Sequence, residues 1–183
     1  MGILLAFAPF VIFAILDRIV GPLAALTAGA VASAALLARD LVISRHMKVL
    51  ELGTFILFSG LALYTLLDNA HWSIVGVRLC VDAGLLLIVL GSTAAMCPFS
   101  LQYARQQVAP ELWTRPEFIR TNYVITVVWA LAFLVMVIAE LGLLYFPKLP
   151  PRVGILVIIL ALIGAVKFTG WYPDRETRGS DIR

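Results

Sequence analysis

The chain has little of what soluble enzymes and metal proteins use for chemistry. Only two histidines and two cysteines occur among its 183 residues, and they form no CxxC, HExxH or mixed cluster. The sequence therefore predicts no metal site and no cofactor. Cys80 and Cys97 lie in one apolar run, separated by roughly 25 Å at about 1.5 Å per helical residue, so we expect no disulfide between them.

Catalytic motifs are missing as well. The chain contains no GxSxG, no GxGxxG, no P-loop and no convincing pair of nucleophile and base. An enzyme is therefore the least supported class of function. Charged residues make up only 14% of the chain and cluster between apolar runs, and the net charge is +3. This charge fits basic loops beside anionic lipid headgroups better than nucleic-acid binding.

What the chain has in abundance is apolar sequence. Its hydrophobic fraction is 62%, against about 45–50% in soluble domains, which indicates an integral membrane protein. A helical span needs about 20 apolar residues. By that measure we predict an all-α bundle of about six spans, forming one domain over residues 1–172, with spans at 3–16, 19–38, 50–67, 74–96, 123–146 and 153–168. The first segment is short and lacks the basic start of a signal peptide, so we expect it to be retained.

Lysine and arginine are distributed unevenly between alternate connections, which predicts the orientation. One side carries Arg18, Arg78, Lys148 and Arg152, and the other carries Arg39, Arg45, Lys48, Arg105, Arg115, Arg120, Lys167, Arg175, Arg178 and Arg183. The positive-inside rule then places both termini in the cytoplasm. If the first segment did not cross, the N-terminus would lie outside. The tail 173–183 is polar and is predicted to be disordered.

The connection 97–122 is the longest polar segment between spans. Pro98 ends the fourth span, and a short amphipathic helix is predicted from Leu101 to Val108 in the cytoplasmic membrane interface. Aromatic anchors and arginines would contact lipid phosphates there, and a docking surface for a protein partner is the alternative. The candidate contact residues are Tyr103, Arg105, Trp113, Arg115, Phe118 and Arg120.

Ionisable residues within the predicted spans are the candidates for an intramembrane site. Arg78 and Asp82 are four residues apart and can pair as an ion or proton relay, or Arg78 can reach the headgroups while Asp82 neutralises it. Glu140 is a second candidate, unless it lies at the interface and pairs with Lys148 or Arg152. The outward cluster of Asp68, Asn69, His71 and Trp72 is better explained as a solvated loop with an interfacial tryptophan.

The layout resembles the bacterial intracellular septation protein A family of small inner-membrane proteins. The matching residues are Phe7-Ala-Pro9-Phe10, Lys48 with Glu51, Gly60-Leu-Ala-Leu63, Pro98, Trp113 and Trp129-Ala-Leu-Ala-Phe133. The resemblance implies a role in the cell envelope or in division and carries no catalytic residue. Two hypotheses follow from the sequence. One is a non-enzymatic envelope protein that acts through the 97–122 connection, with lipid, a second copy or another envelope protein as its partner. The other is a small oligomeric channel or ion-coupled transporter that uses Glu140 or the Arg78 and Asp82 pair.

Overall fold

The computed structural model describes residues 2–43, 47–68, 73–146 and 148–180, with side chains from Leu4 to Pro173 within those ranges. Every regular element there is helical, in agreement with the predicted all-α class. The elements are α1 Gly2–Ala6, α2 Ala8–Leu16, α3 Pro22–Ile43, α4 Val49–Leu67, α5 Ile74–Ala94, α6 Phe99–Ala104, the 3-10 helix η1 Pro110–Leu112, α7 Pro116–Tyr145 and α8 Pro151–Ser180.

Within the described ranges, five helices are long and apolar enough to cross a bilayer. They are Pro22–Ile43, Val49–Leu67, Ile74–Ala94, Pro116–Tyr145 and the part of α8 from Pro151 to Pro173. The N-terminal apolar segment Leu4–Leu16 is shorter. It is divided at Phe7, and the nine residues of α2 extend only about 13 Å, against a hydrocarbon core of about 30 Å. The structure therefore supports a multi-pass protein with five candidate spans, where the sequence predicts about six.

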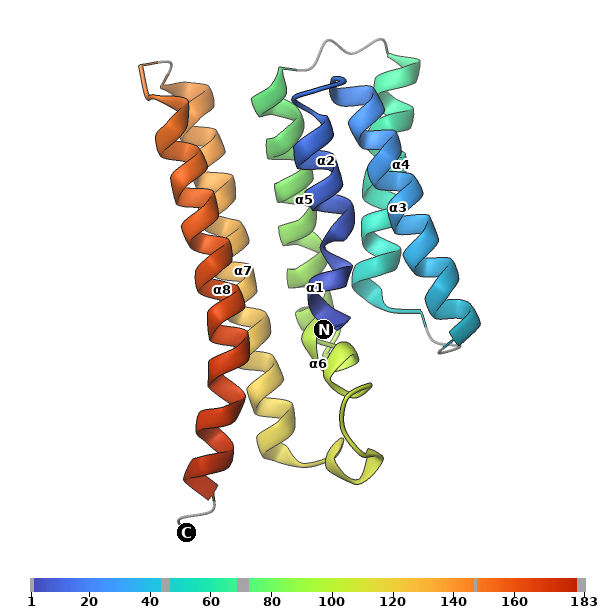
Figure 1. The fold of residues 1–183 in the computed structure, drawn as a ribbon, viewed down its shortest axis with the longest axis vertical. Coiled ribbons are helices and arrows are strands. Elements are labelled where there is room, and N and C mark those ends of the chain that lie inside the picture. The colour runs from blue at the N-terminus through green and yellow to red at the C-terminus, as the bar shows by residue number, and fades with distance from the viewer. Residues whose placement is uncertain (1, 44–46, 69–72, 147, 181–183) are drawn as a thin grey trace. The chain divides into compact units, whose positions relative to one another are not determined.

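The chain divides into two compact units, Met1–Ile88 and Val89–Arg183. In the first unit, α2, α3 and α4 lie side by side with the first part of α5 (Figure 1). Their core joins residues from all four helices, with Phe13 from α2, Leu26 from α3, Phe58 from α4 and Val81 from α5. Gly21, with φ of +91°, makes the turn between α2 and α3, a backbone conformation that glycine adopts without steric cost.

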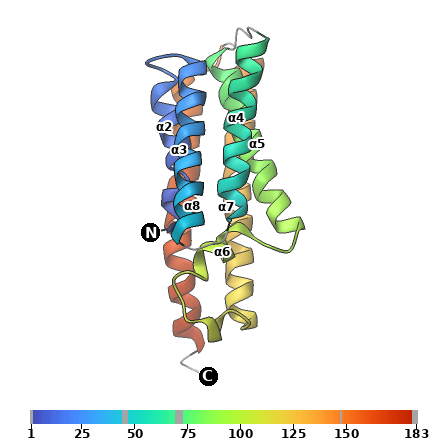
Figure 2. The same cartoon turned by 90° about the vertical axis from the view of Figure 1, so that its right-hand side faces the viewer.

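In the second unit, α7 and α8 form an antiparallel pair, and α6 packs on the first turns of α7 (Figure 2). Helix α7 begins at Pro116, whereas the sequence predicts a span from Tyr123. The N–H of the first helical residue has no acceptor within the helix, so a proline, which lacks that N–H, costs no hydrogen bond there. Pro116 therefore starts α7 instead of breaking the chain. Residues 116–122 of the predicted interfacial segment are therefore the first two turns of α7.

Helix α8 continues through Pro173 to Ser180, where the sequence predicts a disordered tail. The physical reason is that a helix already formed upstream adds residues without paying again for nucleation. Arginine and glutamate in the tail are good helix formers, so polarity alone does not end the helix. Pro173 removes one backbone hydrogen bond from α8 without ending it.

Candidate functional site

The segment between α5 and α7 is tied down by buried hydrogen bonds. Ser100 Oγ donates to the carbonyl of Asn122 at 2.7 Å and lies 2.8 Å from Thr126 Oγ1. Since Ser100 has one hydroxyl proton, Thr126 is the donor in the second contact. All three residues are buried, and they fix α6 against α7. We call residues 97–122 the platform.

The predicted helix of the platform is shifted and shorter than expected. Helix α6 covers Phe99–Ala104, where the sequence predicts Leu101 to Val108. Its buried residues are Phe99, Ser100, Leu101 and Tyr103, whereas Ala104 and Val108, which lie on the same face as Leu101 in the predicted helix, are only half-buried. The chain cannot continue as one helix because Pro110 favours an extended residue before it, and Ala109 has that conformation.

The structure separates the six predicted contact residues into three groups. Tyr103 is only 2% exposed, so its side chain is packed inside the protein. The guanidinium of Arg105 lies over the Trp113 ring, 5.7 Å from its centroid, and Trp113 Nε1 donates to the Val108 carbonyl at 3.3 Å. This cation–π contact closes the turn between α6 and η1. Phe118 is half-buried, whereas Arg115 and Arg120 are exposed.

The predicted intramembrane pair has a partner that sequence spacing did not suggest. Arg78 Nε donates to Asp17 Oδ2 at 3.1 Å, and its Nη2 donates to the Ala14 carbonyl at 3.3 Å. Asp82 lies one turn further along α5, on the same face of the helix as Arg78, and is half-buried. The chain order contained a signal for this arrangement. Asp17 precedes α3 and Arg78 follows α4, so an antiparallel α3–α4 pair brings both to the same end of the unit.

A second charge cluster was missed, because the sequence presents it as part of a charged connection. Asp40, Lys48 and Glu51 are all buried at the junction of α3 and α4. Lys48 Nζ contacts Asp40 Oδ2 and lies 3.3 Å from Glu51 Oε1. Arg39 Nη2 lies 2.9 Å from Asp40 Oδ1, with 43% of its side chain exposed. We call these four residues the clamp, since they join the end of α3 to the start of α4.

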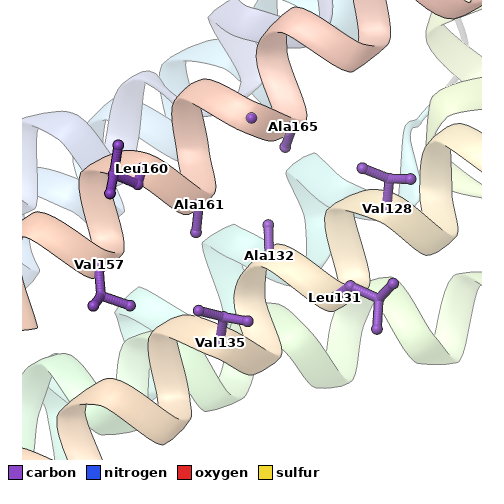
Figure 3. A pocket seen from close by; sticks show the side chains of 9 residues that line it. Val128, Leu131, Ala132, Val135, Val157, Leu160, Ala161 and Ala165 are labelled. Atoms are coloured by element: carbon purple, nitrogen blue, oxygen red, sulfur yellow. The ribbon is translucent and has the colours of Figure 1, made fainter.

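Glu140 is 3% exposed, in the last two turns of α7. Close by, α7 and α8 approach so closely that a Cβ on Gly154 would lie 2.4 Å from Leu143 Cδ1. Further along the same pair of helices is an open groove of about 420 Å³, lined only by valine, leucine, alanine and glycine (Figure 3). The groove holds no titratable side chain, so Glu140 is not part of it.

Among the described residues, no group of three or more His, Cys, Asp or Glu side chains could hold a metal ion. Cys80 is half-buried and Cys97 is exposed, and the two do not form a disulfide. Asp68 is exposed. Three other members of the predicted outward cluster, Asn69, His71 and Trp72, lie outside the described residues, as do Arg45 and His46.

Comparisons of the chain with protein-family models, with curated proteins and with solved structures found no match. The resemblance drawn from scattered sequence positions therefore identifies no family. The fold and the apolar helices assign the chain to the multi-pass helical membrane proteins.

Proposed function

We propose that this protein is a non-enzymatic component of the bacterial inner membrane that supports cell-envelope or division processes through its platform. The observation that carries the proposal is the buried Ser100, Asn122 and Thr126 network. A passive connector needs no such network. Here it holds α6 in place while Glu111, Arg115, Glu117 and Arg120 remain exposed on the outside of the platform.

The length of α7 supports a platform at the membrane surface. Its 30 residues extend about 45 Å, which exceeds a hydrocarbon core of about 30 Å. The polar residues of this helix that lie near its start, from Glu117 to Asn122, would therefore stand beyond the apolar core. Arg115 and Arg120 are then available for anionic headgroups or for a protein partner.

The proposal includes an orientation. The excess of lysine and arginine at the α3–α4 junction, on the platform and at the end of α8 favours the cytoplasm for all three. Five spans are consistent with this arrangement. The N-terminus is cytoplasmic if Leu4–Leu16 also crosses, and it lies on the opposite side if that segment does not.

Charge reversal on the platform tests the proposal in a bacterium from which the gene has been deleted. We expect the double variant Arg115→Glu, Arg120→Glu to insert and fold but to leave the envelope or division defect of the deletion uncorrected. Reversal removes the attraction to anionic headgroups or to an acidic partner. The matched control is Lys148→Glu, an exposed reversal in the α7–α8 turn. Full correction of the defect by the platform variant, measured as cell length and envelope permeability, contradicts the proposal.

A small oligomeric channel or ion-coupled transporter is the second candidate, and the burial of Glu140 favours it. Placing an ionisable side chain within an apolar span costs free energy, so such a residue is a candidate for a functional role. We expect Glu140→Gln to reduce ion flux in proteoliposomes by at least about tenfold if this candidate holds. Glu117→Gln, an exposed change in the same helix, should leave the flux unchanged. Equal flux in wild type and Glu140→Gln removes Glu140 from the site.

A further inference from the structure

Two carboxylates in the first unit share one guanidinium. Asp17 has a side chain that is 0% exposed, and its Oδ2 accepts a hydrogen bond from Arg78. Its Oδ1 is also buried and has no hydrogen-bond partner. Asp82 lies one helical turn from Arg78 on the same face of α5, and it is half-buried. We call Asp17, Arg78 and Asp82 the shared-arginine cluster.

The cluster carries one negative charge more than it can balance. Arg18, which follows Asp17 in the chain, and Asp68, at the end of α4, are both exposed. The first half of α3, from Pro22 to Ser33, and the middle of α4, from Leu52 to Leu63, contain no Asp, Glu, Lys or Arg. The clamp at the other end of α3 differs, because its two carboxylates face two cations, Lys48 and Arg39.

An unbalanced carboxylate among apolar helices is costly to keep charged, and a carboxylate commonly escapes that cost by taking up a proton. We infer that the shared-arginine cluster is a proton-binding site that holds one proton on its two carboxylates. Arg78 neutralises one carboxylate, and the proton neutralises the other. In the structure Arg78 pairs with Asp17, which leaves the proton on Asp82.

The shared-arginine cluster lies between the end of α2 and the interior of α5. It is independent of the platform, and it does not require the protein to be a transporter. Its occupancy depends on charge balance within three side chains, so each substitution has a definite consequence for the number of protons bound.

Infrared spectroscopy of the purified full-length protein in lipid nanodiscs at neutral pH tests the inference. We expect one carbonyl band of a protonated carboxylic acid from this cluster, with the shift in heavy water that such a group shows. Asp82→Asn should remove the band, because Arg78 and Asp17 then balance. Asp17→Asn should also remove it, because Arg78 is then free to pair with Asp82. Glu140→Gln is the control that identifies any band from the second unit.

A third variant tests the same site in the opposite direction. Arg78→Gln removes the cation, so both carboxylates should be protonated and the band intensity should double. Gel filtration and circular dichroism first establish that each variant folds like wild type. The doubled band intensity expected of Arg78→Gln tests the inference even if neither asparagine variant folds. The absence of the band in wild type overturns the inference, as does its survival at full intensity in either asparagine variant.

Discussion

Replacing Lys48 by methionine is expected to lower the free energy of unfolding by about 3–5 kcal/mol. Lys48 is buried between Asp40 and Glu51, which are buried as well. Methionine preserves most of the volume of lysine but removes its charge, and two carboxylates then lie close together without the cation between them. Removing one partner from a buried ion pair is far more costly than the net contribution of that pair. Unfolding in mixed detergent micelles, monitored by circular dichroism, measures the change.

Arg39 provides the matched control within the same clamp. Its side chain is 43% exposed, so Arg39→Gln should cost no more than about 1 kcal/mol although it also removes a cation from Asp40. The triple variant Asp40→Asn, Lys48→Met, Glu51→Gln should recover most of the loss, because no uncompensated charge is left buried. A loss in Lys48→Met no larger than that in Arg39→Gln would show that water reaches the clamp.

Substituting Gly29 by alanine is expected to destabilise the protein by about 1–3 kcal/mol through overpacking. A Cβ at this position would lie 2.7 Å from Phe58 Cδ1 and 2.8 Å from Cε1. The Phe58 ring has little space to move. It is fully buried, and its centroid lies 5.2 Å from that of Phe10 and 5.6 Å from that of Phe13. The added methyl group must therefore separate α3 from α4, and the same unfolding measurement reports the cost.

Gly60→Ala in α4 is the control for this prediction. A Cβ there meets nothing within 4 Å, so alanine should be neutral or should stabilise by up to about 1 kcal/mol through its higher helix propensity. Equal stability of the two variants would mean that α3 and α4 adjust their separation freely. That result would contradict a tightly packed first unit.

In the shared-arginine cluster, residue spacing predicts one relation between the side chains and not the other. Arg78 and Asp82 are four residues apart, and this spacing places them on one face of a helix from the sequence alone. The hydrogen bond from Arg78 to Asp17 joins residues 61 positions apart, and no periodicity indicates such a contact. Lys48 and Glu51 were visible as a charged pair, but their burial was not, because a charged connection between spans ordinarily faces water.

For the platform too, the sequence predicts the segment but not its tertiary contacts. Prolines and aromatic residues mark the segment in the sequence, and Pro98 and Pro110 do divide it. The orientation of Tyr103 and the contact between Arg105 and Trp113 depend on how α6 packs against α7. Helix α7 begins at Pro116 because the six residues from Glu117 to Asn122 are helical as well, and the low hydropathy of this stretch concealed that from the sequence.

By itself the sequence determined the helical membrane class of this protein and the approximate places of the five long candidate spans, although it predicted about six. Apolar runs of about 20 residues are a local property, and the bilayer has a fixed thickness that selects them. Only the tertiary structure decided that Arg78 pairs with Asp17, that Lys48 is buried between two carboxylates, and that α6 is fixed by Ser100. The physical reason is that charge balance and hydrogen bonding in an apolar interior depend on which helices meet, and partners far apart in the chain are chosen by packing rather than by spacing.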